Sequence, residues 1–388
     1  MAKKRRGNKD DSKSQKKKKK TEIDRSENDQ ITIEEIFARF PHLSDAIFVR
    51  LDDRSLASCR EVNKTWQAFV DRQRIYWIRK ILKYANPQSK FHEEWKTVVA
   101  KTPIKVLKQF ARFVWLQPKN ESSPLYVAGS LGDIELFNCI KEKTGLNEES
   151  KNNQGRTPFH VAAFNNRISL CKAIIEKIQD KNPGCNTGET PLHIAARLGH
   201  LNVCQLIMEK LQDKSPRCKK GNTPLHMAAS FGHLKVCQLI MAELDNKYPK
   251  CNHGLTPLHM AAIKGHLDIC KLIYENIINT GALKMLDEMN SETNTGLTPL
   301  LYAARFGHVE VCKFLCWILE EKNPKNKAGV TGLHSAAEHG QLDVCKLLCL
   351  NLQDKNPKDD SGRTPLDAAC SNKHWKVLYF LIAENNLN

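Results

Sequence analysis

Histidine and cysteine side chains recur close together in this chain, and both residue types can do chemistry. The stretch TPLHIAARLGHLNVCQ, residues 190–205, contains His193, His200 and Cys204. Imidazole nitrogens and thiolates bind zinc, and a thiol beside an imidazole can act as an activated nucleophile. Either use requires the side chains to converge at one place. The elements that carry them therefore decide between a chemical and a structural role.

The quoted stretch is one copy of a segment that returns along the chain. The copies begin at Ser123, Thr157, Thr190, Thr223, Thr256, Thr298, Thr331 and Thr364. The interval is 33 or 34 residues, with one longer step of 42 residues before Thr298. A constant period of this length is typical of stacked helical repeats, in which each unit buries its apolar face against its neighbours. We therefore expect an array of about eight units rather than a single compact core.

Each unit contains residues that would begin and end two short helices. A glycine two residues before the threonine suits a turn with positive φ, threonine suits a helix N-cap, and proline suits the first helical position. Two alanines and a Gly-His pair follow, and this glycine can end the helix in the left-handed conformation. Leu201, Cys204 and Ile207 then lie on the apolar stripe of a second helix. The sequence predicts a turn and two helices per unit.

The pattern T-P-L-H-x-A-A-x-x-G-H at this spacing resembles the ankyrin repeat over residues 121–388. The resemblance implies an all-α solenoid of helix pairs with short β-hairpin-like turns, which serves as a scaffold for binding proteins. The departures are Asn166 and Lys373 at glycine positions, Gly332 at a proline position, and Leu301 and Asp367 at histidine positions. Asparagine tolerates the left-handed conformation. End repeats are expected to differ because one of their faces meets water.

The repeat gives most histidines a structural place. Nine of the fourteen lie at two repeat positions: His160, His193, His226, His259 and His334, then His200, His233, His266 and His308. The resemblance implies that the first set forms hydrogen-bonding struts between the threonine hydroxyl and the neighbouring backbone. An imidazole suits that role because its two nitrogens offer one donor and one acceptor.

The cysteines also follow the period. Fourteen residues after each threonine come Cys171, Cys204, Cys237, Cys270, Cys312 and Cys345. We expect these small side chains to pack against the next repeat. Repeats advance by about 10 Å, whereas a disulfide needs Cα atoms within about 7 Å. These thiols are therefore predicted to be reduced core residues.

The remaining cysteines give only weak signals for a reactive site. The pairs Cys312/Cys316 and Cys345/Cys349 lack a C-x-x-C partner set, and Cys185, Cys218 and Cys251 lie in loops, where a thiol can be exposed. The chain also has no Gly-rich phosphate loop and no G-x-S-x-G. We expect no catalytic residue, no cofactor and no metal.

The fold implied by the resemblance has a concave face, made by the hairpin tips and by positions four, seven and eight after each threonine. We select Ile194, Arg197, Leu198, Met227, Phe231, Met260, Ile263, Tyr302, Arg305, Phe306 and Glu338 as partner-binding residues. Met, Phe, Tyr and Arg are the types that carry affinity at protein interfaces. The alternative for any single residue is that it packs against a neighbouring repeat.

Residues 31–80 do not follow the repeat, and their apolar spacing predicts three short helices. Their order resembles the F-box, which binds the Skp-type adaptor of cullin-RING ubiquitin ligases. The resemblance rests on Phe40, Pro41, Leu43, Ile47, Leu51, Leu56, Val62 and Trp66. One residue fewer than usual separates Phe40-Pro41 from the Leu-Asp step. The alternative is a helical cap that shields the first repeat, and residues 81–120 are predicted to be a helical linker.

Residues 1–30 form a Lys-rich tail that we predict to be disordered, because it has little apolar surface and its charges repel. About half of the net charge of +17 lies in residues 1–25. The two basic clusters are compatible with nuclear import, nucleic-acid attraction or solubility. Nucleic acid is disfavoured because no aromatic residues interleave the lysines. No signal peptide or membrane span is expected, which places the protein in the nucleus, the cytoplasm or both.

These observations favour a non-enzymatic adaptor, expected to be a monomer. The leading hypothesis is the substrate receptor of an F-box type cullin-RING ubiquitin ligase, whose repeats bind a protein substrate. The alternative is an ankyrin scaffold, for example in the nucleus, that tethers or masks a partner without degradation. A chromatin or RNA binder led by the lysine tail is the third hypothesis.

Overall fold

The computed structural model describes residues 124–279, 289–319 and 322–386. The chain divides into two compact units, Met1–Glu121 and Ser122–Asn388, and all described residues belong to the second unit. The predicted basic tail, the F-box-like residues from Phe40 to Trp66 and the helical linker lie outside the described residues.

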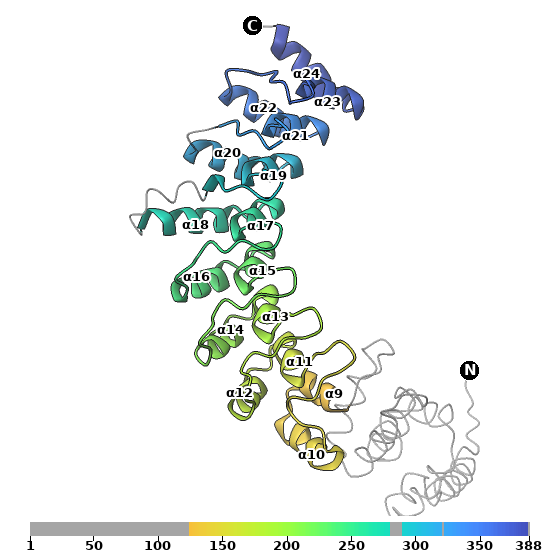
Figure 1. Ribbon diagram of the computed structural model, residues 1–388, viewed down its shortest axis with the longest axis vertical. Coiled ribbons are helices and arrows are strands. Elements are labelled where there is room, and N and C mark those ends of the chain that lie inside the picture. Colours follow the sequence, from red (N-terminus) through yellow and green to blue (C-terminus); the bar gives the residue numbers. More distant parts are fainter. Residues whose placement is uncertain (1–123, 280–288, 320–321, 387–388) are drawn as a thin grey trace, which may run out of the picture. The chain divides into compact units, whose positions relative to one another are not determined.

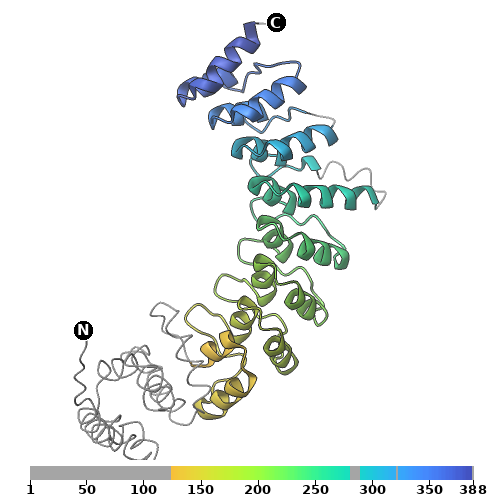
Figure 2. The same ribbon diagram turned by 180° about the vertical axis from the view of Figure 1, so that it is seen from behind.

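The described residues form sixteen helices and no strand, in agreement with the predicted all-α array of helix pairs (Figures 1 and 2). The pairs are α9 (Pro124–Leu131) with α10 (Ile134–Thr144), α11 (Pro158–Phe164) with α12 (Ile168–Lys177), α13 (Pro191–Leu198) with α14 (Leu201–Met208), α15 (Pro224–Ser230) with α16 (Leu234–Glu243), α17 (Pro257–Lys264) with α18 (Leu267–Asn279), α19 (Pro299–Phe306) with α20 (Val309–Ile318), α21 (Gly332–Glu338) with α22 (Leu342–Asn351), and α23 (Pro365–Ser371) with α24 (Trp375–Asn386). Each pair occupies one copy of the period.

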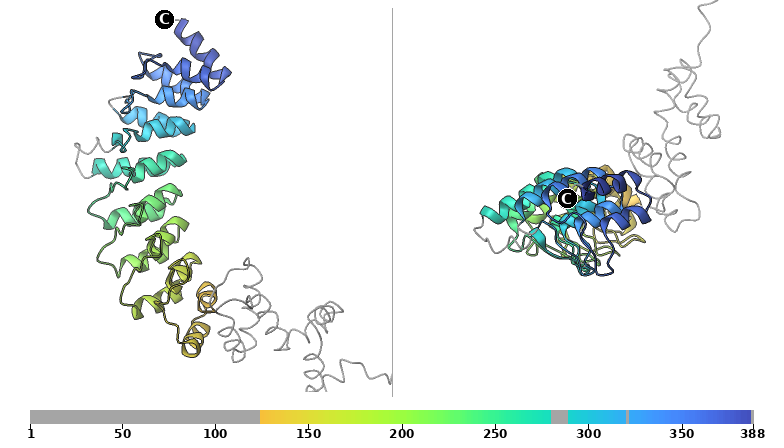
Figure 3. Two further views of the ribbon diagram at one scale, coloured as in Figure 1. Left: turned by 45° about the vertical axis from the view of Figure 1, so that its right-hand side comes forward. Right: turned by 90° about the horizontal axis from the view of Figure 1, so that it is seen from above.

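The pairs stack in a row of two columns (Figure 3). We call the odd-numbered helices the inner helices and the even-numbered helices the outer helices. Each inner helix packs against the inner helices of the neighbouring pairs, and these contacts are more extensive than those between outer helices. Close approach is allowed by small side chains such as Ala195 and Ala196, which are fully buried. One apolar core therefore continues from repeat to repeat.

Each inner helix starts at a residue that satisfies the free backbone groups of the helix end. Thr190 has an extended backbone with φ −104°, Pro191 takes the first helical position, and the Thr190 side chain accepts from the backbone N–H of His193. In return, the backbone N–H of Thr190 donates to Nδ1 of His193 at 3.2 Å. This is a capping box in which histidine replaces the usual glutamate or glutamine. The predicted N-cap and proline positions are confirmed.

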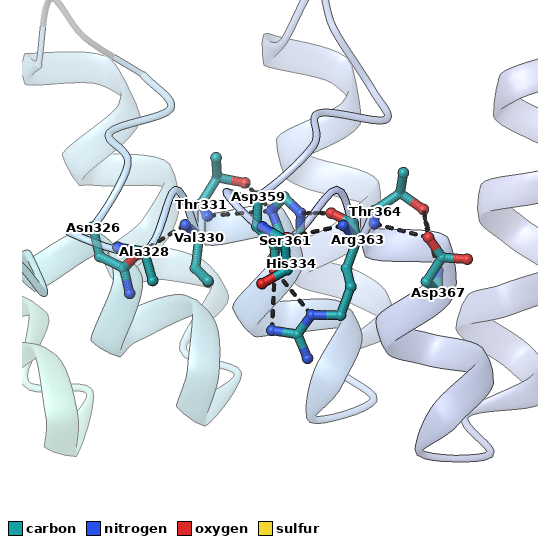
Figure 4. Close-up of polar contacts among 10 residues, drawn as sticks. All are labelled: Asn326, Ala328, Val330, Thr331, His334, Asp359, Ser361, Arg363, Thr364 and Asp367. Atoms are coloured by element: carbon teal, nitrogen blue, oxygen red, sulfur yellow. Dashed lines mark hydrogen bonds and ion pairs between the residues drawn. The ribbon is translucent and has the colours of Figure 1, made fainter.

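The same histidines join each repeat to the next one. His193 Nε2 donates to the carbonyl of Asn222 at 2.9 Å, which leaves Nδ1 of the neutral ring as the acceptor for Thr190. Equivalent struts run from His160 to Glu189, from His226 to Leu255, from His259 to Leu297 and from His334 to Arg363. All of these imidazoles are buried, and Figure 4 shows the strut of His334. The strut role implied by the resemblance is confirmed.

The last repeat replaces the strut with a group that only accepts hydrogen bonds. Asp367 Oδ2 accepts from the backbone N–H of Thr364 at 2.9 Å and from its hydroxyl at 2.8 Å (Figure 4). Among the described residues, no later hairpin offers a carbonyl to this position, so a donor would have no use there. The hydrogen bonds from Thr364 lower the pKa of Asp367.

A second set of histidines joins each repeat to the preceding one. His200, His233, His266, His308 and His374 donate from Nε2 to the carbonyls of Phe164, Arg197, Ser230, Ile263 and Glu338, at 2.9 to 3.2 Å. A glycine precedes each of these histidines except His374, and it makes room for the imidazole or amide of the next repeat. A Cβ added to Gly199 would lie 2.5 Å from Nδ1 of His233, and Gly199 has a positive φ of 74°. Both space and conformation therefore require glycine there.

The seam between α19 and α21 lacks both kinds of histidine. Leu301 takes the strut position and is buried. Gln341 replaces the second histidine, and its Nε2 donates to the carbonyl of Arg305 at 3.3 Å. The Lys327 ammonium adds a hydrogen bond to the carbonyl of Asn294 at 2.9 Å. This seam depends more than the others on apolar packing.

Two non-glycine residues adopt positive φ at helix ends where other repeats have glycine: Asn166 at 56° and Lys373 at 59°. Since a side chain with a Cβ is strained in this region and asparagine is the best tolerated, the strain falls mainly on Lys373. We expect Lys373→Gly to raise the free energy of unfolding by about 0.5 to 1 kcal/mol, and Asn166→Gly to raise it by less. Urea unfolding of both variants measures the difference. A Lys373→Gly variant no more stable than the natural chain would contradict the assignment.

Burial lowers the pKa of the strut histidines, to about 4 for His160, His226 and His259, from an ordinary 6.5. Between these values the unfolded chain binds more protons than the folded chain, so stability is highest above pH 6.5 and falls toward pH 4. Each such histidine contributes a slope of about 1.4 kcal/mol per pH unit. We expect the urea midpoint to fall steadily from about pH 7 to about pH 5.

His226→Gln provides the control for this pH dependence. The amide can donate and accept like the neutral imidazole but does not titrate. The variant should therefore release about one proton fewer per molecule on refolding at about pH 5. A natural chain whose urea midpoint does not change with pH would show that the struts are not neutral in the folded state.

Candidate functional site

The recurring thiols belong to the core and do not form a reactive centre. Burial raises the pKa of Cys171, Cys204, Cys237, Cys270 and Cys345 to about 12. They stay protonated at neutral pH, whereas a nucleophile or metal ligand must be a thiolate. The part of the chain that the structure describes has no group of three or more His, Cys, Asp or Glu side chains placed to hold a metal ion. The predicted core position of these cysteines is confirmed.

The loop cysteines, whose thiols could be exposed by their place in the sequence, are mostly covered in the structure. Cys218 and Cys251 are buried, and Cys185 is half-buried. Each begins a hairpin: the backbone N–H of Cys218, for example, donates to the carbonyl of Asn222 at 2.9 Å. The sequence places these residues in loops, but a residue at the base of a tight hairpin is covered by it. Cys370, in the last inner helix, is exposed instead.

Most of the predicted partner-binding residues lie on one exposed surface at the C-terminal halves of the inner helices, which we call the inner face. Phe231 and Phe306 are 54% and 48% exposed. Arg305 and Glu338 are also exposed, whereas Arg197, Leu198, Met227, Met260, Ile263 and Tyr302 are half-buried. Large apolar side chains that are exposed on this scale can anchor a partner protein.

Ile194 does not belong to the inner face, because only 1% of it is exposed. Its position, four residues after the threonine, lies at the seam between inner helices. Tyr302 shows this, since its ring meets that of His259 in the preceding repeat edge-on, with centroids 5.9 Å apart. Ile194 and Ser335 are buried at this position, whereas Val161 and Met227 are half-buried. Burial at this seam therefore does not follow side-chain length.

Phe164 is a member of the inner face that the sequence analysis did not select. It is 48% exposed and lies seven residues after Thr157, at a position selected in later repeats. The signal was therefore present in the repeat pattern. Phe164 ends α11, Phe231 directly follows α15 and Phe306 ends α19. Exposed phenylalanines thus mark every second helix pair.

Two arginines on the inner face are held in place by neighbouring side chains. Arg197 forms an ion pair with Glu189, in the hairpin before α13, at 3.0 Å. Arg305 Nε donates to Nε2 of His339 at 3.1 Å. The Arg305 guanidinium also lies 6.0 Å from the ring centre of Phe306, within cation–π range. An arginine fixed beside an exposed aromatic ring is the composition typical of a binding hot spot.

The outer helices carry a second group of exposed apolar residues, which the sequence analysis did not select. Trp317 and Leu350 lie on α20 and α22 at the same repeat position, nineteen residues after the threonine, and both are largely exposed. Earlier repeats have Glu176 and Glu209 at that position. The loss of the glutamate was the available signal. The Trp317 ring also contacts Tyr274 of the preceding outer helix, with centroids 6.1 Å apart.

No helix within the described ranges is both long enough and apolar enough to cross a bilayer.

Comparison with known families gives one result. A family model described as ankyrin repeats in three copies matches residues 125–218, 210–284, 246–325, 277–359 and 316–388. These overlapping matches cover the array from the first helix pair to the last. Among curated proteins, no sequence matches the chain.

Thiol labelling tests whether the cysteines are core residues. We expect a maleimide reagent to modify Cys370 about 100-fold faster than Cys204 or Cys237 in the folded protein, because labelling of the buried thiols requires unfolding. Mass spectrometry of digested samples taken over time measures each site separately. In urea the rates should become similar. Fast labelling of Cys204 without urea, or its protection by added zinc, would contradict the core assignment.

Proposed function

The chain belongs to the ankyrin-repeat family, and from that premise we propose that it is the substrate receptor of an F-box type cullin-RING ubiquitin ligase. Ankyrin repeats bind proteins and are generally not catalysts, in keeping with an array whose recurring thiols and strut imidazoles are buried. In this proposal the inner face binds the protein to be ubiquitinated. The F-box-like residues bind the Skp-type adaptor, and other subunits transfer ubiquitin.

The inner face supports the part of the proposal that concerns binding of the substrate protein. Phe164, Phe231 and Phe306 leave about half of their surface in water, which is a large amount for phenylalanine in an isolated molecule. Their recurrence on alternate helix pairs gives an elongated surface with several anchor points. Arg305, fixed beside Phe306, adds a polar anchor to this row.

The ligase half is supported by the order of residues from Phe40 to Trp66, above all Leu51-Asp52 followed by Leu56, Val62 and Trp66. This segment lies outside the described residues. It belongs to a compact unit, Met1–Glu121, that is distinct from the array. An adaptor needs two separate binding modules, and the division of the chain into two units is consistent with that need.

The second candidate is a scaffold that tethers or masks its partner without a ligase. It is favoured by the family matches, which begin at residue 125 and cover the array alone. The lysine clusters at residues 3–6 and 16–20 would direct such a scaffold to the nucleus.

A pull-down with a purified Skp-type adaptor decides between the two. We expect the full chain to retain the adaptor, and Leu51→Ala with Trp66→Ala to weaken binding at least about tenfold, because both side chains are large apolar anchors of the F-box-like segment. Phe231→Glu with Phe306→Glu is the matched control: it should retain the adaptor and lose the proteins captured by the array. A full chain that does not bind the adaptor would support the scaffold.

A further inference from the structure

Exposed cations recur along the hairpins, six residues before the threonine of each repeat. They are Lys151, Arg217, Lys250, Lys325 and Lys358, which we call the cation row, while Gly184 and Glu292 occupy this position in the other two of the seven repeats that begin with threonine. All five cations are exposed. Within the described ranges, none of them forms an ion pair with an acidic side chain. The charge of the row is therefore not neutralised by acidic side chains, although the Arg217 guanidinium also donates to a backbone carbonyl.

Lysines nine residues before the threonine, three residues earlier than the cation-row position, are used by the fold. Lys181 donates to the carbonyls of Ile175 and Ile178, at 2.8 and 2.6 Å, and so satisfies the end of α12. Lys355 pairs with Glu384 of α24 at 2.8 Å. The contrast separates lysines that stabilise the outer helices from cations that remain open to a partner.

Three observations place the hairpins that carry the cation row next to the inner helices. The Arg217 guanidinium donates to the carbonyl of Lys250 at 2.8 Å, so members in consecutive repeats are neighbours. The charges of Lys151, Arg217 and Lys250 each help to lower the pKa of the buried strut histidine of the same repeat. Glu189, in a hairpin, pairs with Arg197 of the inner face. Hairpins and inner face therefore form one continuous surface.

The spacing of the row matches an extended polypeptide. Packed helices are about 8 to 10 Å apart, so one repeat advances by about that distance. An extended chain rises about 3.3 Å per residue, and three residues therefore cover about one repeat. Along the array the charges read positive, neutral, positive, positive, negative, positive, positive, with Glu292 as the negative member.

We propose that the inner face and the cation row together bind an extended acidic segment of a partner protein, with a carboxylate at every third residue and a neutral or basic residue opposite Glu292. The exposed phenylalanines, two repeats apart, would contact apolar residues of the segment at intervals of about six residues. The proposal rests on the proposed function only in that the array binds a protein.

A nucleic acid is a poorer fit to the same surface. Its phosphates carry uniform negative charge, so the Glu292 position and the exposed Glu338 on the inner face would repel it. A polypeptide can place a neutral or basic residue opposite each acidic group. Interrupted charge therefore favours a protein ligand over a polyanion.

Fluorescence anisotropy with the full chain tests the proposal. The probe is a labelled peptide of about 15 residues in which glutamate recurs at every third position between serine and valine. The comparison probes are a peptide of equal composition with its glutamates grouped at one end, and a single-stranded oligodeoxynucleotide of similar length. We expect saturable binding of the first peptide, weaker binding of the other two, and loss of affinity as salt rises.

The variants locate the binding site. Arg217→Glu with Lys250→Glu should weaken the first peptide about tenfold, since two attractions become repulsions. Arg217→Gln with Lys250→Gln should give a smaller loss. The matched control is Lys235→Glu with Lys271→Glu, two exposed lysines on the outer helices of the same two repeats, and should change affinity less than about twofold. Glu292→Lys should tighten binding.

Several outcomes would overturn the proposal. One is that the first peptide does not bind saturably, and another is that the grouped peptide binds with equal affinity. The others are that the matched control variant loses as much affinity as Arg217→Glu with Lys250→Glu, or that Glu292→Lys does not raise the affinity. Tighter binding of the oligodeoxynucleotide with the same sensitivity to the variants would assign the row to nucleic acid. A failed Skp-adaptor pull-down leaves this assay unchanged, because the peptide requires only the array, so the two proposals can fail separately.

Discussion

A neutral imidazole buried between two repeats is the interaction on which the array depends. Its Nδ1 accepts from the threonine that starts an inner helix, and its Nε2 donates to the backbone of the next hairpin, as in the strut from His193 to Asn222. Loss of either partner would leave a buried polar group unsatisfied, at a cost of about 1 to 3 kcal/mol. The strut therefore fixes where each hairpin lies relative to the helix before it. It thereby also fixes the positions of the side chains that the hairpin carries.

This arrangement separates structural from exposed groups. The seams use histidine for its paired donor and acceptor and cysteine for its small apolar bulk, and both are removed from solvent. The struts form hydrogen bonds to the hairpin backbones, whereas hairpin side chains such as Lys250 are exposed. The exposed side chains take no part in the seams between repeats. They can therefore vary without loss of the fold. That separation explains how histidine and cysteine can recur along the array as structural residues.

Much of the array could be predicted from the sequence because its period places equivalent residues in equivalent surroundings. Helix starts and core thiols follow from repeat position, and the struts follow from the resemblance to ankyrin repeats. Exposure at the seams does not follow from repeat position: Ile194 is buried, whereas Val161 and Met227 at the equivalent position are half-buried. The outcome depends on the neighbouring side chains of each seam. The cation row could be recognised only from the contacts in the structure. Sequence alone does not distinguish Lys355, which pairs with Glu384, from Lys358, which forms no ion pair within the described residues. The F-box-like segment stays a prediction.

The seam between α19 and α21 has a consequence for how the array would behave in an acidic environment. Leu301 carries no proton, whereas the seams on either side depend on His259 and His334, which protonation would disrupt. Acid would therefore divide the array into segments instead of loosening it evenly, and α19 to α22 would remain together as one segment. A ligand bound across several repeats would then contact segments that no longer hold a fixed position relative to one another. It would dissociate before the whole protein unfolded.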